Sequence, residues 1–475
     1  MTSNSSTTQH YDTIIIGAGQ GGALARMLAQ ASQRVALVEA AHVGGTCVNV
    51  GCTPTKTLAY SARVAYLVGR SGDYGVRTGP TRFDIQVARQ RKRDIVLDFR
   101  QGVEKGLHAI ENVHLLYGKA QFCGPKQIKV ELNAGGECTL EAKTIVIAAG
   151  TRFALPPVAG LAEVPYLDST SIMELGEVPS HLLILGGGYI AVEFGQMFRR
   201  FGAQVTLIEV GHQLLAREDA DIAEAATKIL REDGLDIHLN SKAKQARRTE
   251  DGQIELVVQA EAGEQTLRGS HLLVAAGRKP NTDTLNVAAA GVALDDKGYV
   301  QVNEKLETNM PGIYALGDIK GGPAFTHIAY DDARILCANL GEGHDATIHN
   351  RLVPYTVFID PQLGRIGLTE QEARAQGYKV RVASLTMDQT ARGSETGETR
   401  GLWKVVVDDA TNQILGGAFL SIEGGEIATT VQVAMMGHLP YTALRDGTFS
   451  HPTLSESLNN LFLAMDRVHK PGKQE

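Results

Sequence analysis

The sequence predicts an α/β fold with two Rossmann-like dinucleotide-binding domains and a C-terminal α+β domain. Two observations lead to this prediction. Glycine-rich turns between an apolar strand and a helix occur twice, at 13–22 and at 182–191. Each turn is followed later by an apolar segment that ends in Ala-Ala-Gly, at 145–150 and at 272–277. A unit that recurs in this way predicts two copies of one nucleotide-binding architecture.

The first turn leads from an apolar strand into a helix and then to a second strand at 35–39. Its glycines permit a tight turn and a close approach of the backbone to a pyrophosphate, which the N-terminus of the helix faces. An acidic residue at the end of the second strand can accept a hydrogen bond from a ribose hydroxyl. The residues that match this fingerprint are Gly17, Gly19, Gly22 and Glu39.

The second turn has the same order of strand, helix and strand. Two such turns in the same context favour dinucleotide binding over ordinary glycine-rich turns between a strand and a helix. A carboxylate at the end of its second strand repels the 2′-phosphate of NADPH, and the residues at 210–216 include no Lys or Arg to bind one. NADH is therefore favoured, and His212 leaves NADPH open. The fingerprint residues are Gly186, Gly188, Ala191 in place of the third glycine, and Glu209.

The second module interrupts the first, because a further signature at 312–318 follows it. We therefore expect the first nucleotide-binding domain at 1–152 and 280–350, the second at 153–279, and the C-terminal domain at 351–475. In the C-terminal domain, strands are predicted at 403–407 and 414–419, and helices at 426–436 and 454–465. A helix is also predicted at 83–107, with a solvated basic face formed by Arg89, Arg91, Lys92 and Arg93.

Composition excludes several classes of protein. Of the 475 residues, 43% are hydrophobic and 21% charged, as in globular proteins, and a net charge of −7 offers no basic field to nucleic acid. The chain has no apolar run of the ~20 residues that span a bilayer, and its Ser/Thr-rich start lacks the apolar segment of a signal peptide. Five cysteines are too few for a disulfide scaffold. We expect a cytoplasmic protein without nucleic-acid or membrane partners.

Two of the cysteines, Cys47 and Cys52, lie close together. A zinc site is disfavoured because the other cysteines supply no second ligand pair, and inert thiols are an equally weak alternative. Gly51 allows a sharp turn, Thr53 can cap a helix, and Pro54 suits its first position. The helix dipole would then favour the thiolate of Cys52, which disulfide exchange requires. The pair is interpreted as a redox centre, and no metal site is expected.

These motifs resemble those of the class I pyridine nucleotide-disulfide oxidoreductases, a family that includes glutathione reductase, dihydrolipoyl dehydrogenase and mercuric reductase. The resemblance runs in order along essentially the whole chain. It is carried by the segments 44–56, 186–193 and 308–318, and by His451, Pro452 and Thr453 with Glu456. The resemblance implies a flavoenzyme of cell redox homeostasis and a homodimer joined through the C-terminal domain.

The resemblance also implies roles for individual residues. Lys56 would lie near the flavin and pair with Glu193, and Tyr189 would cover the flavin until the nicotinamide displaces it. FAD would be bound by Gly17, Gly19, Gly22, Glu39, Thr46 and Asp318. Gly150 and Gly277, which end the two Ala-Ala-Gly segments, are added to the expected cofactor-binding residues.

The catalytic roles implied by the resemblance concern four side chains. Cys52 would face the flavin, and Cys47 would attack the substrate. His451, oriented by Glu456, would be the acid/base that completes the site of the other subunit. Taken alone, a histidine before proline is more often a loop residue, but the cysteine pair and Glu456 favour catalysis.

The substrate depends on the branch of the family. Mercuric reductases carry a C-terminal cysteine pair that is missing at 463–475, and the segment at 53–56 differs from the Ile-Pro-Ser-Lys of dihydrolipoyl dehydrogenase. The segment at 439–458 is closer to the reactive-chlorine-resistance flavoproteins. We expect an NAD(P)H-dependent reductase of an oxidant such as hypothiocyanous acid or a small disulfide. Dihydrolipoyl dehydrogenase, an Hg(II) or Cu(II) reductase, and a regulatory flavoprotein remain alternatives.

Overall fold

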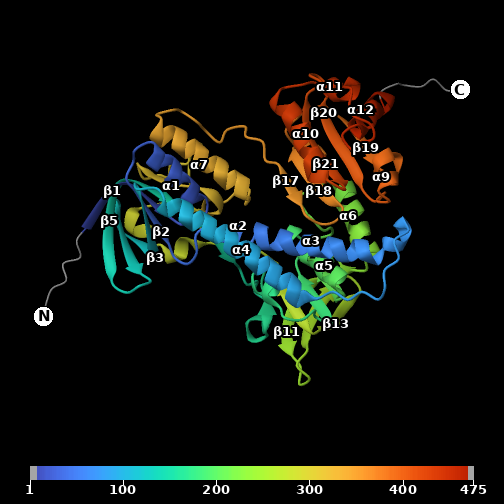
Figure 1. Cartoon of the computed structure of the whole chain (residues 1–475), viewed down its shortest axis with the longest axis horizontal. Coiled ribbons are helices and arrows are strands. Elements are labelled where there is room, and N and C mark those ends of the chain that lie inside the picture. The colour runs from blue at the N-terminus through green and yellow to red at the C-terminus, as the bar shows by residue number, and fades with distance from the viewer. Residues whose placement is uncertain (1–7, 469–475) are drawn as a thin grey trace. The chain divides into compact units, whose positions relative to one another are not determined.

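The computed structural model describes residues 8–468 (Figure 1). The predictions about the N-terminal leader and the C-terminal tail fall partly on residues 1–7 and 469–475, which lie outside the described range. The chain divides into two compact units. The first comprises the chain up to Thr57, Arg89–Ala154 and Gly277–Arg351, and the second comprises Leu58–Ala88, Leu155–Ala276 and the chain from Leu352 onward. The mixed α/β architecture confirms the predicted fold class.

The first unit is built on a parallel sheet in the order β3-β2-β1-β5-β16. Strands β3 and β5 continue beyond it and pair with β4 in an antiparallel meander. The strands are β1 (Thr8–Ile16), β2 (Val35–Glu39), β3 (Val113–Gly124), β4 (Gln127–Leu132), β5 (Glu137–Ile147) and β16 (Ile313–Ala315). A short antiparallel pair joins β6 (Thr151–Phe153) to β15 (Arg278–Pro280).

Both faces of this sheet are buried, as expected for parallel strands that are covered on two sides. In β1, Ile14 and Ile16 enter one hydrophobic cluster while Ile15 enters another, because successive side chains point to opposite faces. Helices α1 (Gln20–Gln30) and α7 (Thr326–Gly341) lie side by side and pack into the cluster of Ile15 (Figure 1). The opposite face is covered by the meander.

The second unit repeats this strand order in the parallel sheet β10-β9-β8-β14-β7. An antiparallel sheet of β11, β12 and β13 follows β10, in the place that the meander has in the first unit. The elements are β7 (Tyr166–Leu167), β8 (His181–Leu185), α5 (Tyr189–Phe201), β9 (Gln204–Ile208), α6 (Ala220–Glu232), β10 (Asp236–His238), β11 (Lys242–Arg248), β12 (Ile254–Ala260), β13 (Gly263–Gly269) and β14 (His271–Val274).

The C-terminal part of the second unit is an antiparallel sheet in the order β17-β18-β21-β20-β19. Trp403 is fully buried there and meets Phe419 edge to face, with ring centroids 5.6 Å apart. The elements are β17 (Tyr355–Val357), β18 (Gln362–Gly367), α8 (Glu370–Ala375), β19 (Val380–Thr386), α9 (Ala391–Glu395), β20 (Leu402–Asp408), β21 (Ile414–Ser421), α10 (Gly424–Met436), α11 (Tyr441–Asp446) and α12 (Ser457–Val468).

Three more helices position the cysteines and join the units: α2 (Gly45–Val50), α3 (Cys52–Gly69) and α4 (Ile85–His108). Helices α3 and α4 each run from one unit into the other. The prediction that Lys92 lies on a solvated face of α4 is wrong, because this residue is only 3% exposed. Ala88, Lys92 and Val96 recur at every fourth residue and form the buried face of this helix.

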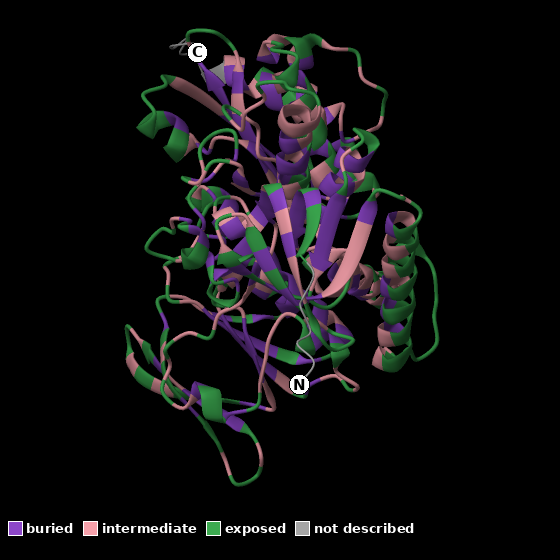
Figure 2. Ribbon diagram, turned by 90° about the vertical axis from the view of Figure 1, so that its left-hand side faces the viewer, coloured by how far each residue is buried: buried purple, intermediate pink, exposed green. Residues whose placement is uncertain are grey.

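Buried residues gather along the strands of the sheets, whereas the loops and the outer faces of helices are exposed (Figure 2). The candidate binding residues therefore lie on loops and helix ends at the edges of buried sheets.

Within residues 8–468, no helix is long and apolar enough to cross a membrane.

Candidate active site

The two glycine turns have the same geometry in the two units. Gly17 has φ +107°, and a Cβ atom at this position would collide with the carbonyl oxygen of Ala148. Gly186 has φ +115°, and its Cβ would lie 2.6 Å from the carbonyl oxygen of Ala275. Both values belong to the left-handed region that glycine tolerates. Only glycine therefore allows the backbone to turn from the strand into the helix at these points.

The first turn has the features that a dinucleotide pyrophosphate requires. Helix α1 begins after Gly19 and carries no acidic residue in its first turn, so its positive N-terminus is uncompensated. The first residue of α2 approaches closely, since a Cβ on Gly45 would lie 2.7 Å from the Cα of Gly19. Gly22 is buried within α1, and Thr46 is exposed on α2. These residues fit the adenine dinucleotide part of FAD.

Two carboxylates border this turn. Oε2 of Glu39 accepts the backbone N–H of Ala18 at 2.8 Å, so the carboxylate at the end of β2 lies directly at the glycine turn. Asp318, in the signature after β16, accepts a hydrogen bond from the hydroxyl of Thr151 at 3.1 Å. Gly150 follows β5 with φ +64°. Each of these residues belongs to the first unit.

The second turn provides a similar site in the second unit. Helix α5 begins at Tyr189 after Gly188, has no acidic residue in its first turn, and buries Ala191 completely. Oε1 of Glu209 accepts the backbone N–H of Gly211 at 2.6 Å, which holds the carboxylate beside the turn. Gly277, which follows β14 with φ +148°, belongs to the first unit. This geometry fits a pyridine nucleotide.

Cys47 lies in the short helix α2, and Cys52 is the first residue of α3. The carbonyl oxygen of Gly51 accepts the N–H of Thr55 at 3.1 Å, which begins the hydrogen-bond ladder of α3. The prediction that Thr53 caps this helix is therefore wrong, and Pro54 is its third residue. The helix begins earlier because the sharp turn at Gly51 already aligns the backbone. Cys52 consequently lies in the first turn of an 18-residue helix.

The pair is electrostatically asymmetric. The hydrogen bond with Cys47, the hydroxyl of Thr326 and the ammonium of Lys56 lower the pKa of Cys52 to about 6. The hydrogen bond with Cys52 and burial raise the pKa of Cys47. Lys56 follows Cys52 by one helical turn and so lies on the same side of α3. At neutral pH the reduced pair therefore carries its negative charge on Cys52.

Thr326 is a contact that sequence reasoning missed. Its Oγ1 lies 3.4 Å from Sγ of Cys52, although the two residues are 274 positions apart in the chain. Thr326 begins α7, beyond the signature that ends at Asp318. No local motif singles out its hydroxyl, because only the folding of the first unit brings α7 to the cysteines.

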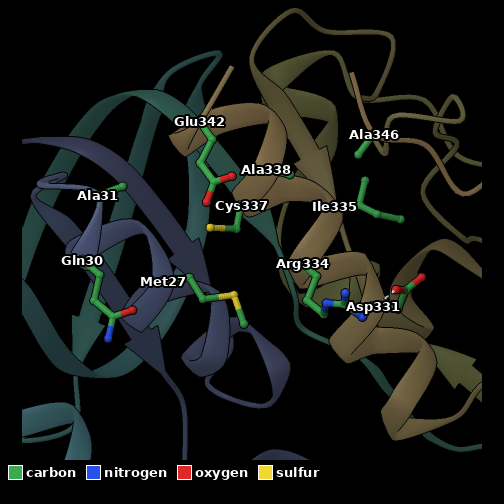
Figure 3. A pocket seen from close by; sticks show the side chains of 10 residues that line it. All are labelled: Met27, Gln30, Ala31, Asp331, Arg334, Ile335, Cys337, Ala338, Glu342 and Ala346. Atoms are coloured by element: carbon green, nitrogen blue, oxygen red, sulfur yellow. Dashed lines mark ion pairs between the residues drawn. The ribbon is translucent and has the colours of Figure 1, made fainter. Parts of the chain in front are cut away.

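Two half-buried thiols outside the pair, Cys138 and Cys337, have raised pKa values instead. Burial raises the pKa of Cys138, and burial together with the charge of Glu342 raises the pKa of Cys337. Cys337 lines a pocket between α1 and α7, where it points into the space between Met27 and Glu342 (Figure 3). None of the sequence-predicted site residues lines this pocket. Within residues 8–468, no group of three or more His, Cys, Asp or Glu side chains could hold a metal ion.

The structure brings His451 and Glu456 together in the second unit. Nδ1 of His451 lies 2.9 Å from Oε2 and 3.1 Å from Oε1 of Glu456. The imidazole is 70% exposed, whereas the carboxylate is 33% exposed. Thr453 helps to hold the turn, since its hydroxyl accepts the N–H of Glu456 and donates to the carbonyl oxygen of Ser450.

The expected pair of Lys56 and Glu193 involves residues of different units. Glu193 is 4% exposed in α5, and its Oε1 accepts the backbone N–H of Phe358 at 2.8 Å. Its pairing with Lys56 stays a prediction.

Comparisons with known proteins agree with this combination of sites. The family described as "Pyridine nucleotide-disulphide oxidoreductase" matches residues 11–333, and its dimerisation domain matches residues 353–462. The chain is 38% identical to "Probable pyridine nucleotide-disulfide oxidoreductase RclA" of Escherichia coli, over 95% of this chain and 98% of that protein. Identity to a mercuric reductase of Bacillus cereus is 34%, over 96% of this chain and 72% of that protein. Identity to a dihydrolipoyl dehydrogenase of Thermus scotoductus is 35%, over 97% and 98%.

Solved structures show the same similarity. The structure of the "HOCl-induced flavoprotein disulfide reductase RclA from Escherichia coli" matches with a TM-score of 0.86 at 38% identity, over 95% of this chain and 99% of that chain. The Cu(II) complex of the same protein matches with a TM-score of 0.87 at 37% identity, over 97% and 100%.

Proposed function

The chain belongs to the pyridine nucleotide-disulphide oxidoreductase family and is a flavoprotein disulfide reductase, and on this premise we propose that it reduces a small sulfur oxidant or disulfide with NADH. The observation that carries the proposal is the asymmetric pair of Cys47 and Cys52. A dithiol with one ionised sulfur at a helix N-terminus is suited to exchange with an oxidised sulfur. The family uses FAD and a pyridine nucleotide, so the reducing equivalents enter through the two nucleotide sites.

The residues that would hold FAD are those of the first unit: Gly17, Gly19, Gly22, Glu39, Thr46, Gly150 and Asp318. The pyridine nucleotide would be bound by Gly186, Gly188, Tyr189, Ala191 and Glu209 of the second unit, and Gly277, which belongs to the first unit, is the further residue expected to bind it. When bound, the flavin supplies the transfer of two electrons from the nicotinamide to the disulfide of Cys47 and Cys52.

The thiol chemistry then follows from the two cysteines. Cys47, as its thiolate, attacks one sulfur of the substrate disulfide, so that a mixed disulfide forms and the first product thiolate leaves. The Cys52 thiolate next attacks Sγ of Cys47, which forms the Cys47–Cys52 bond and expels the second product thiolate. Two electrons have then passed to the substrate and the dithiol is oxidised; one product thiolate receives the proton that Cys47 gave up, and the other takes its proton from solvent.

His451 would exchange the protons that these steps need. A carboxylate accepts but does not donate, so the Nδ1 of His451 is the donor in its bond to Glu456. The other ring nitrogen, Nε2, is then free to take the proton of Cys47 and to return it to a leaving thiolate. We place this residue at the site of a partner subunit in a homodimer.

Homodimerisation is supported by the match of residues 353–462 to a dimerisation domain. Apolar side chains are exposed within this segment, with 63% of Val433, 63% of Met436 and 44% of Leu439 accessible. These residues lie on α10 and directly after it. A symmetric interface that covers them would bury this apolar surface.

The preference for NADH rests on Glu209, whose carboxylate is held beside the second turn by Gly211. A ribose hydroxyl can donate to this carboxylate, whereas a 2′-phosphate would be repelled. The identity to RclA over nearly the whole chain supports an oxidant that arises from reactive chlorine, such as hypothiocyanous acid.

One steady-state experiment tests the proposal. The purified flavoprotein is assayed for NADH and NADPH oxidation with hypothiocyanous acid, glutathione disulfide, lipoamide, Hg(II) and Cu(II), in parallel with Cys47→Ser. We expect the highest rate with one sulfur substrate and its loss in Cys47→Ser. Turnover with lipoamide alone would indicate a dihydrolipoyl dehydrogenase. Turnover with metal ions alone would reject the proposal in favour of a metal-ion reductase.

A further inference from the structure

Thr326 approaches the cysteine pair from a separate part of the first unit. Its hydroxyl lies 3.4 Å from Sγ of Cys52, and it also acts on Cys47, whose pKa it lowers. We propose that Thr326 is a further catalytic residue, whose hydroxyl donates to Sγ of Cys52 and keeps the negative charge of the dithiol on that sulfur. The inference rests on the proposed dithiol mechanism and adds a hydrogen-bond donor to the groups that stabilise the thiolate of Cys52.

The hydroxyl of Thr326 is not used for another structural purpose at this helix end. Threonine near a helix N-terminus commonly caps the exposed N–H groups. In α7, however, the N-cap is Phe325, and no side-chain cap is formed. Thr326 is instead the first residue of a 16-residue helix, with its hydroxyl directed at the sulfur. This is the arrangement expected of a donor to a reacting atom.

A threonine hydroxyl has a single proton and can therefore donate to one sulfur at a time. The groups that face Cys52 select this sulfur as the acceptor. Cys52 lies in the first turn of α3 and near the Lys56 ammonium, so a thiolate is stabilised there by the helix dipole and by a positive charge. Cys47 lies in a helix of six residues, and the main influences on its pKa are Cys52, burial and Thr326. Donation to Cys52 is thus the lower-energy choice.

This hydrogen bond has a consequence for the resolving step. In the mixed disulfide, Cys52 must attack Sγ of Cys47 as a thiolate, so its charge must be present before the attack. The hydroxyl of Thr326 maintains that charge near neutral pH. As the Cys52–Cys47 bond forms, the electron pair of Cys52 enters it, and the leaving thiolate takes the charge and then a proton.

The test measures the ionisation of each cysteine in the reduced holoenzyme, without any substrate. Iodoacetamide alkylation of Cys47 and Cys52 is followed by peptide mass spectrometry between pH 4.5 and 9. Thr326→Val removes the hydroxyl and keeps the shape of the side chain. We expect the alkylation midpoint of Cys52 to rise by about one pH unit, with alkylation about tenfold slower below the midpoint. Thr326→Ser should restore the wild-type profile.

Thr57→Val is the matched control, because it removes a threonine hydroxyl from α3 that donates to the carbonyl oxygen of Thr53. Flavin absorbance and thermal melting check that each variant is folded, and Thr326→Ala replaces Thr326→Val if the valine variant loses FAD. An unchanged Cys52 midpoint in the folded variant would overturn the inference. An equal shift of the Cys52 alkylation midpoint in Thr57→Val would also overturn the inference. The profile is independent of substrate, so failure of the proposed function would instead appear as absence of Cys47-dependent turnover.

Discussion

Nδ1 of His451 lies 2.9 Å from Oε2 of Glu456, and the carboxylate is the less exposed member of the pair. The carboxylate fixes the tautomer and the orientation of the imidazole, and it leaves Nε2 to exchange a proton. In the proposed mechanism, Glu456 is therefore a positioning residue for His451.

Substitution of Glu456 by Gln should lower turnover with the sulfur substrate by roughly tenfold, and His451→Gln should lower it by ~100-fold or more. The amide can still bond to Nδ1, but it no longer stabilises the protonated imidazole. The pH profile of kcat measures the effect, and its acidic or basic limb should move in Glu456→Gln. FAD content should be unchanged in both variants. Wild-type turnover in His451→Gln would contradict the assigned proton exchange.

Alkylation of the reduced protein should be selective among its cysteines. The pKa of Cys52 is lowered to about 6, so its thiolate is present at neutral pH and is lost as the pH falls below 6. Burial raises the pKa of Cys138 and Cys337, which should therefore remain unlabelled at pH 7. Peptide-resolved mass spectrometry after brief iodoacetamide treatment checks this order. Faster labelling of Cys337 than of Cys52 would be inconsistent with it.

The two glycine turns should fail in different ways when a methyl group is added. Gly17→Ala places a Cβ against the carbonyl oxygen of Ala148, so we expect loss of FAD or of the folded protein. Gly186→Ala strains only the second turn and should keep the flavin absorbance while NADH no longer reduces the flavin rapidly. Absorbance spectra and stopped-flow reduction distinguish the two results. Rapid reduction by NADH in Gly186→Ala would show that this turn does not bind the nucleotide.

Glu209→Gln should shift the preference between the two nicotinamide nucleotides. The amide removes the repulsion of the 2′-phosphate and keeps the size of the side chain, so we expect kcat/KM for NADPH relative to NADH to rise by about tenfold. Steady-state kinetics with both nucleotides measure this ratio. A ratio equal to that of the wild type would show that Glu209 does not determine the preference between NADH and NADPH.

A buried ion cluster should contribute strongly to stability. The carboxylate of Asp233 is 6% exposed and lies 3.1 Å from Arg200 and 2.6 Å from Arg400. Asp233→Asn leaves two guanidinium groups without this charge, and we expect a loss of about 3 kcal/mol in the free energy of unfolding. Lys228→Gln is the control, because its 4.0 Å pair with Glu232 is exposed and should matter little. Chemical denaturation measures the free energy of unfolding of both variants. Equal losses in Asp233→Asn and Lys228→Gln would contradict the prediction.

Local sequence patterns were sufficient to predict the two glycine turns and the repeated strand, helix and strand that surround them. The turn at Gly17 requires a left-handed glycine between an apolar strand and a helix, and this requirement is visible in the residues themselves. The same holds for Gly186 and for the spacing of Cys47 and Cys52. Such features depend on neighbours within a few residues. The family that they indicate is confirmed by the family match, and the redox role of the cysteines stays a prediction.

Other features were decided by the tertiary structure, because they depend on segments that are distant in the chain. The hydroxyl of Thr326 reaches Cys52 only when α7 packs against the first sheet. Burial of Lys92 and the start of α3 at Cys52 likewise follow from packing and from backbone geometry at Gly51. The sequence determined which residues carry the charge and the sulfur, and the fold decided which of them meet, because contacts between distant segments form only when the sheets bury their faces.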